Sequence, residues 1–138
     1  MSYIGDFVED AEVVFFFNTV DDTAAPITIG GTAAVAVYKD GGATQSAAGV
    51  TVTEDFDSVT GLHKVVVAMT DDAFYAAGSD YVAVISTGTA DSISIVGGVV
   101  KEWSCENRFN EVDVTKQLGV AVTDVYQAVV KCFDTGSA

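Results

Sequence analysis

The sequence has few basic residues, with 6 Lys and Arg against 20 Asp and Glu, for a formal net charge of -14. Nucleic-acid binding needs a basic patch, and docking on anionic membranes needs clustered Lys and Arg, so we expect neither partner. The apolar runs, such as residues 65–69 and 82–85, are strand-sized and much shorter than the ~20 residues of a membrane helix. A chain that is 49% hydrophobic has enough apolar side chains for a packed core, which argues against disorder.

The sequence also has a single histidine, His63, which restricts the catalytic sites that it allows. A Ser-His-Asp or Cys-His arrangement would need His63 together with Ser58, Ser104 or Cys105. None of these residues lies in a nucleophile elbow, and a lone histidine within a strand is typically a surface or cross-strand residue. We therefore assign no catalytic residue and expect no enzymatic activity.

Acidic residues recur in the expected turns, and loops rich in oxygen ligands can bind calcium. Asp55 and Asp57 have the spacing that begins an EF-hand loop, but the glycine at its sixth position and the late glutamate are absent. Acids in turns commonly serve solvation and turn geometry instead. The glycine pairs also lack the lysine and the helix of a phosphate-binding loop. We assign no metal and no cofactor, and calcium at these turns is the open alternative.

Only two cysteines are present, Cys105 and Cys132, and they have neither CxxC spacing nor a nearby histidine, which argues against a zinc site. They are interpreted as free thiols that pack as small hydrophobic side chains, because synthesis in the cytosol keeps thiols reduced. The alternatives are a disulfide within the chain and a disulfide between subunits.

The composition favours β-structure, with thirteen glycines, one proline and abundant Val and Thr. Alternating or continuous apolar segments predict strands at residues 13–18, 32–39, 49–56, 62–69, 80–86 and 92–103. Asp40-Gly41-Gly42 predicts a hairpin turn, residues 71–78 a single helical turn, residues 87–91 a turn, and Gly97-Gly98 a bulge or close backbone contact. Strands of this number and spacing are typical of an antiparallel β-sandwich or barrel, of immunoglobulin-like or jelly-roll size.

The chain is expected to divide into an N-terminal arm (residues 1–11), the β-domain (residues 12–108) and a C-terminal extension (residues 109–138). In the extension, apolar residues recur at alternating steps of four and three, the seam spacing of a helix that packs on a partner. The seam residues are Leu118, Val122, Val125, Val129 and Cys132. Gly119 and the β-branched valines weaken this helix, and Thr123 is an alternative N-cap for a shorter one.

Three consecutive phenylalanines, Phe15, Phe16 and Phe17, place aromatic rings on both faces of the first strand of the β-domain. A strand with apolar side chains on both faces is usually covered on both, either by the core or by a partner. Core packing is the common fate of phenylalanine. These three residues and the seam residues Leu118, Val122, Val125 and Val129 are our candidates for contacts between subunits or with a partner protein.

Seven short segments within residues 12–108 together carry a resemblance to a known family. They are residues 14–19 (VFFFNT), 25–28 (APIT), 37–40 (VYKD), 55–57 (DFD), 60–63 (TGLH), 74–81 (FYAAGSDY) and 104–108 (SCENR). This set resembles a family of small β-rich virion proteins that tailed bacteriophages encode among their structural genes. None of its elements is a catalytic signature.

The resemblance implies a non-enzymatic structural protein, made in the host bacterial cytoplasm and incorporated into the virion. The preferred role is head decoration, as a cement protein on the major capsid protein, in a homo-oligomer for which a trimer is favoured. The alternative is an accessory protein of the neck, tail or baseplate. High negative charge suits exposed copies that must remain soluble.

A carbohydrate-binding β-sandwich is the alternative from a different functional class. Trp103, Tyr75 or Tyr81 would serve as its stacking platforms for sugar rings. Such a site requires an exposed aromatic side chain beside polar groups, whereas these three aromatics lie in segments that are predicted to form the core.

Overall fold

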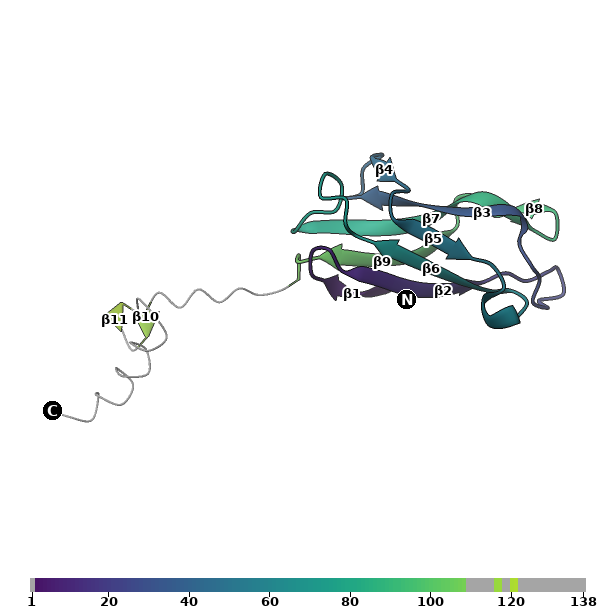
Figure 1. The fold of residues 1–138 in the computed structure, drawn as a ribbon, viewed down its shortest axis with the longest axis horizontal. Coiled ribbons are helices and arrows are strands. Elements are labelled where there is room, and N and C mark those ends of the chain that lie inside the picture. Colours follow the sequence, from purple (N-terminus) through teal and green to yellow (C-terminus); the bar gives the residue numbers. More distant parts are fainter. Residues whose placement is uncertain (1, 109–115, 118–119, 122–138) are drawn as a thin grey trace, which may run out of the picture.

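A computed structural model describes residues 2–108, 116–117 and 120–121, and its fold is a β-sandwich of two facing sheets (Figure 1). The larger sheet has the order β1-β9-β7-β3-β4, with β8 paired to one end of β7, and the smaller sheet has the order β2-β6-β5. The strands are β1 Tyr3–Phe7, β2 Glu12–Asn18, β3 Gly30–Lys39, β4 Gln45–Ser46, β5 Val50–Thr53, β6 Leu62–Ala68, β7 Ser79–Ala90, β8 Ile93–Ser94 and β9 Val99–Cys105. A short 3₁₀ helix, η1 Phe56–Ser58, connects β5 to β6.

The strand order corresponds to that of immunoglobulin-type sandwiches. In these folds strands B, E and D form one sheet and strands C, F and G the other. Here β2, β6 and β5 take the places of B, E and D, and β3, β7 and β9 take those of C, F and G. The prediction of a β-sandwich is therefore confirmed. One pairing departs from the antiparallel pattern, because β1 runs parallel to β9 and makes the larger sheet mixed.

The core lies between the sheets and consists of the inward-facing residues of the alternating strands, since successive side chains of a strand point to opposite faces. Its largest fully buried side chains include Trp103, Tyr75, Met69, His63 and Val13. The ring of Phe15 on β2 lies 5.8 Å from the ring of Trp103 on β9, which joins the two sheets at the centre of the sandwich.

The prediction of an N-terminal arm at residues 1–11 is wrong, because Tyr3–Phe7 form β1 at the edge of the larger sheet. Ile4 and Phe7 pack against the core. The strand was hidden in the sequence because Gly5 and Asp6 interrupt its apolar pattern, and because its partner β9 lies almost 100 residues away in the chain.

The turn predicted at residues 87–91 is also misplaced, because β7 continues to Ala90 and the chain reverses at Asp91 and Ser92. Both turn residues have positive φ, of 50° and 64°. Gly88 suggested a turn, but it lies within β7 (φ 144°), where an added Cβ would come within 3.2 Å of Ile29. Close packing therefore explains this glycine better than a reversal does.

The other local predictions from turn residues are confirmed. Asp40 and Gly41 turn the chain with positive φ between β3 and β4. The carbonyl of Gly98 accepts from the amide of Ile85 at 2.9 Å, which is the close backbone contact expected at Gly97-Gly98. The amide of Tyr75 donates to the carbonyl of Asp71 at 2.8 Å and closes one turn over residues 71–75, which is shorter than the helical turn predicted at residues 71–78.

The described part of the C-terminal extension contains two short antiparallel strands, β10 Lys116–Gln117 and β11 Val120–Ala121. A continuous helix that begins at Leu118 is therefore wrong at Val120–Ala121. The seam residues Leu118, Val122, Val125, Val129 and Cys132, and the alternative helix after Thr123, lie outside the described residues. Within the described part of the chain, no helix is long and apolar enough to cross a membrane.

Candidate functional site

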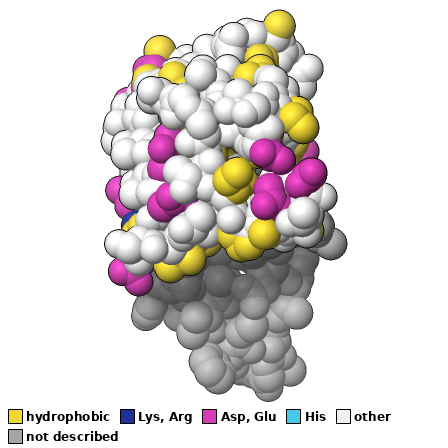
Figure 2. Space-filling view, turned by 90° about the vertical axis from the view of Figure 1, so that its right-hand side faces the viewer, with side chains coloured by type: hydrophobic (Ala, Val, Ile, Leu, Met, Phe, Trp, Pro, Cys, Tyr) yellow, Lys and Arg dark blue, Asp and Glu magenta, His cyan; other side chains and the backbone are white. Residues whose placement is uncertain are grey.

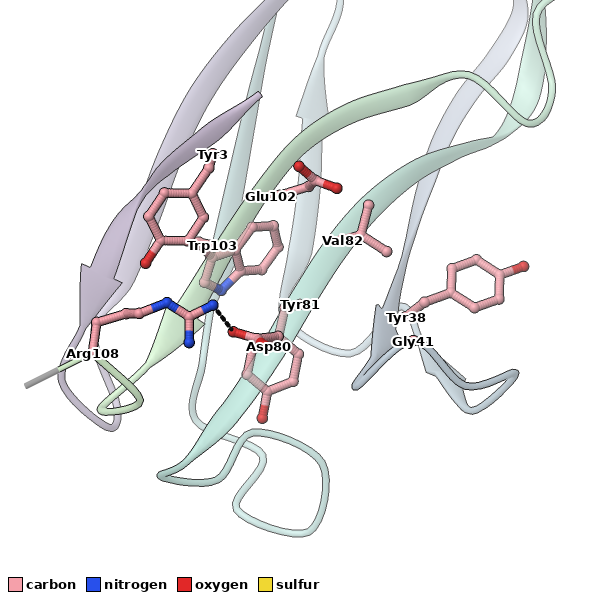
Figure 3. Close-up of a pocket in the computed structure, with 9 residues that line it drawn as sticks. All are labelled: Tyr3, Tyr38, Gly41, Asp80, Tyr81, Val82, Glu102, Trp103 and Arg108. Atoms are coloured by element: carbon pink, nitrogen blue, oxygen red, sulfur yellow. Dashed lines mark ion pairs between the residues drawn. The ribbon is translucent and has the colours of Figure 1, made fainter. Parts of the chain in front are cut away.

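One row of side chains crosses the outer face of the larger sheet from β1 to β3 (Figure 3). The strand register pairs Tyr3 with Glu102, Glu102 with Val82, and Val82 with Tyr38. Paired residues of neighbouring strands point to the same face, so these four side chains lie side by side. The row therefore has a tyrosine at each end and a carboxylate between them, and Tyr3 is 38% exposed.

An ion pair lies beside this row at the end of β9. Nη2 of Arg108 is 3.1 Å from Oδ1 of Asp80, and the guanidinium lies 5.8 Å from the centre of the Tyr3 ring. Asn107 also donates to Oδ1 of Asp80, at 3.1 Å. The Arg108 and Asp80 side chains are about half exposed, so the pair contributes little stability and stays accessible to a ligand.

Asp6 holds the backbone that carries Arg108. Its carboxylate accepts hydrogen bonds from the hydroxyl of Ser104 and from the amides of Asn107 at 3.1 Å and Arg108 at 3.0 Å. Desolvation raises the pKa of Asp6, but these hydrogen bonds and the nearby guanidinium outweigh it, so the pKa lies below its usual value. The ionised carboxylate thus fixes the turn from which Arg108 reaches over Tyr3.

These groups form an open pocket of about 290 Å³. It is lined by Tyr3, Tyr38, Gly41, Asp80, Tyr81, Val82, Glu102, Trp103 and Arg108. Binding sites for polar organic ligands commonly combine aromatic side chains with a few well-placed polar groups. The tyrosines, carboxylates and guanidinium suit a ligand that has hydroxyl groups and an apolar ring face.

The outer face of the larger sheet is apolar next to this pocket. Val84 of β7 pairs with Ala36 on one side and with Val99 on the other. Val99 and Val96 are 57% and 56% exposed. This strip, formed by Val84, Val96 and Val99 beside the buried Ala36, is suited to contact with another protein.

The structure separates the three phenylalanines that the sequence grouped as interface candidates. Phe15 is core, and Phe17 is half-buried with its ring 5.0 Å from that of His63. Phe16 points to the outer face of the smaller sheet, where it is 41% exposed and lies 5.5 Å from the ring of Phe56. Phe16 is therefore the most accessible of the three to a partner.

His63 is completely buried and is not the surface residue that its place in a strand suggested. The amide of Asp55 donates to Nδ1 at 3.2 Å, so the proton of the neutral ring is on Nε2, which lies 2.7 Å from Oγ1 of Thr19. That hydroxyl in turn donates to the carbonyl of Ile27. Burial lowers the pKa of His63. Both ring nitrogens are therefore used within the fold.

The aromatic platforms expected for a carbohydrate site are also different. Trp103, Tyr75 and Tyr81 are at most 2% exposed, so none of them can stack on a ligand. Tyr3 and Tyr38 take this position instead. Tyr38 occupies an outward position in its alternating strand, a signal visible in the sequence, whereas Tyr3 was hidden in the expected arm.

Cys105 is buried in the core as a small apolar side chain. Burial raises the pKa of its thiol to about 11, so the thiol is protonated and unreactive at neutral pH. Cys132 lies outside the described residues, so the alternative of a disulfide between it and Cys105 stays untested.

The acidic turn at Asp55 serves the fold. Its carboxylate accepts from the hydroxyl of Thr28 and from the amide of Gly61 at 2.8 Å, which holds the β5–β6 connection against the β2–β3 loop. In the described residues, no three His, Cys, Asp or Glu side chains gather in an arrangement that could hold a metal ion.

Comparisons with protein-family models, with curated proteins and with solved structures found no match for this chain. The class that the structure itself defines is an acidic sandwich with immunoglobulin-type strand order. A fold of this kind hosts many functions, so the function has to be argued from its surfaces.

Proposed function

We propose that this chain is a non-enzymatic virion structural protein of a tailed bacteriophage, with head decoration on the major capsid protein as its preferred role. The virion assignment rests on the segments of residues 12–108 that resemble such proteins. The observation that supports a non-enzymatic role is the environment of His63. The only histidine of the sequence is fully buried and uses both ring nitrogens in structural hydrogen bonds, so it has no access to a substrate.

The surface of the sandwich suits a protein displayed in many copies. Figure 2 shows the end of the sandwich, where acidic and hydrophobic side chains are interspersed and Lys or Arg appears only at the margin. Like-charged copies repel one another, which favours solubility at high local concentration. The apolar strip of Val84, Val96 and Val99 is the surface that we assign to the contact with the capsid.

Purified virions of the phage that encodes this chain provide the test. We expect mass spectrometry to find the chain in particles purified on a density gradient, and gold-labelled antibodies against residues 2–108 to decorate the head. Label confined to the neck, tail or baseplate would support the accessory-protein alternative and overturn head decoration. A chain that is absent from purified particles would overturn the virion assignment altogether.

The pocket that contains Tyr3 and Arg108 favours a second candidate, binding of saccharides. Sugar rings stack on exposed tyrosines, and their hydroxyl groups hydrogen-bond to carboxylates and guanidinium groups, all of which meet here. An array of bacterial surface glycans would test it, with Tyr3→Ala and Arg108→Ala as variants. Val59→Ala, at an exposed site on the β5–β6 turn, is the control. Binding lost in both pocket variants and kept in the control supports this function, and the absence of any glycan signal rejects it.

A further inference from the structure

Strand β2 is an edge strand of the smaller sheet. Its seven residues pair with β6 on one side, and no strand pairs with its other side in the part of the chain that the structure describes. In immunoglobulin-type sandwiches the first strand commonly lies next to strand B. Here the first strand, β1, pairs with β9 in the other sheet instead and leaves this edge open.

The hydrogen bonds show which residues of β2 face the open edge. Ala11 and Thr19, which flank β2, bond to Met69 and Gly61 of the β6 side at 3.1 and 3.2 Å. Hydrogen-bonded pairs alternate along an antiparallel ladder, so the odd-numbered residues of β2 bond to β6. The even-numbered residues therefore direct their N–H and C=O groups outward. They are Glu12, Val14, Phe16 and Asn18.

The other edges of the sandwich are protected, whereas that of β2 is not. β1 contains an irregularity between Tyr3 and Asp6, and β5 has only four residues. On β3, the amide of Ala33 donates to the carboxylate of Glu54 at 2.8 Å. β2 has a regular register and contains no proline, lysine or bulge, which are the usual devices against edge-to-edge pairing.

The outward residues of β2 are also apolar where the strand is most accessible. Val14 and Phe16 are 43% and 41% exposed on the outer face of the smaller sheet. Phe56 contacts Phe16 there, and the ammonium of Lys64 lies 5.0 Å from the Phe56 ring. A strand added at this edge would gain backbone hydrogen bonds together with apolar contacts.

We propose that β2 pairs antiparallel with β2 of a second copy of this chain, across a two-fold axis at Phe15. This register places Val14 opposite the partner's Phe16 and Glu12 opposite the partner's Asn18. All the hydrogen-bonding positions then match, because even-numbered residues face even-numbered residues, and the ladder forms about eight bonds. Two three-stranded sheets become one continuous sheet through the dimer.

The residues along the edge favour a second copy as the occupant. Glu12 is the only charged residue of β2, and the register around Phe15 places it opposite a neutral amide rather than its own copy. A two-fold interface must be complementary to itself, and this strand fulfils the condition with apolar residues opposite apolar ones. The contact is small and the copies carry a net charge of -14 each, so we expect a weak dimer that salt strengthens by screening the repulsion.

Light scattering with reductant present tests the proposal, because reductant removes any disulfide-linked dimer. From about 5 to 500 µM, a range suited to weak association, the mass should rise from 14.3 kDa toward twice that value, and further at 0.5 M than at 0.05 M salt. Val14→Pro removes an outward amide without touching the ladder to β6, and Val14→Lys adds a charge to the edge. Both variants should stay monomeric, and Ile93→Lys, a lysine at an exposed β-branched residue of β8, should dimerise as the unaltered chain does.

Amide hydrogen exchange makes the test specific to the edge. The amides of Val14 and Phe16 should gain protection as the concentration rises, while those of Val13 and Phe15, bonded to β6, should be protected at every concentration. Protection of all four amides at every dilution would mean that a strand of the same chain covers the edge, and would overturn the proposal. A chain that stays at 14.3 kDa, a trimer, or a dimer unaffected by Val14→Pro would also overturn it. A trimer would match the oligomer expected for a head-decoration protein, and the other outcomes do not bear on the virion assignment.

Discussion

Tyr81 and Tyr75 are neighbouring buried tyrosines that differ in the hydrogen bonding of their hydroxyl groups. The Tyr81 hydroxyl accepts from the amide of Ala76 at 2.7 Å and donates to the carbonyl of Phe74 at 3.0 Å. It corresponds to the tyrosine corner of immunoglobulin-type sandwiches, near the start of strand F. The Tyr75 hydroxyl is buried without a partner among the described protein groups. The two rings lie 5.2 Å apart, and each tyrosine is 2% exposed.

Phenylalanine at each position removes one hydroxyl and keeps the ring, so the two variants isolate the hydrogen bonds. Tyr81→Phe leaves the Ala76 amide and the Phe74 carbonyl without their partner, and should lower the free energy of unfolding by about 1–3 kcal/mol. Tyr75→Phe removes a desolvated hydroxyl that gains nothing in return, and should leave stability unchanged or raise it by about 1 kcal/mol. For a domain of this size the difference corresponds to about 4 °C in Tm per kcal/mol.

Urea unfolding followed by tryptophan fluorescence is the assay. Trp103 is the only tryptophan, is 1% exposed, and stacks 6.0 Å from Tyr81, so it reports the opening of the core around both tyrosines. The m-values of the two variants should equal that of the unaltered chain, which shows that only the native contacts changed. A Tyr75→Phe variant that loses as much stability as Tyr81→Phe would refute the reasoning, because ring packing would then explain both effects.

Three further predictions concern the fold. Burial lowers the pKa of His63, so as the pH falls the unfolded chain binds a proton before the folded chain does. The free energy of unfolding should therefore decrease as the pH falls from about 7 through the folded pKa. His63→Gln should abolish this pH dependence in urea titrations between about pH 7.5 and 5.5. Gly49→Ala should cost about 1–3 kcal/mol more than Gly41→Ala in thermal unfolding. Both glycines have positive φ, but only the Cβ at residue 49 would come within 2.3 Å of the Ala68 carbonyl oxygen. Deletion of residues 1–7 should lower the free energy of unfolding by about 1 kcal/mol or more, and Tm by about 4 °C or more, because β1 covers part of the core. An unchanged Tm would support the original prediction that these residues form an arm.

Local sequence signals predicted most of the sandwich correctly. Val and Thr alternate along β5, Ala and Val alternate at residues 34–37 of β3, and β6 contains the apolar run of residues 65–68. The period of two depends only on the geometry of an extended chain. The turn at Asp40 and Gly41 was visible because few residues tolerate positive φ. The expectation of an acidic domain without nucleic-acid or membrane partners came from charge and composition. Both are counts of residues and do not depend on which residues are in contact.

The sequence was least informative where residues far apart in the chain meet. β1 escaped prediction because Asp6 interrupts its pattern, and its partner Ser104 lies 98 residues away. The sequence placed His63 in a strand but did not show which face of the sheet it occupies. Its contact with Thr19, 44 residues away in the chain, accounts for its burial as a neutral ring. Tyr3 gained a role in the pocket only through its register with Glu102.

Composition and short periodic patterns were enough to predict a β-rich, strongly acidic domain with one histidine and no catalytic signature, because they act within a few residues. The tertiary structure decided which sheet received β1, and this single pairing had two consequences. It completed the pocket with Tyr3 on the larger sheet, and among the described strands it left β2 at the edge of the smaller sheet. Strand pairing is a choice between distant segments that offer the same backbone groups, so it depends on the packing of the whole core and not on local preference.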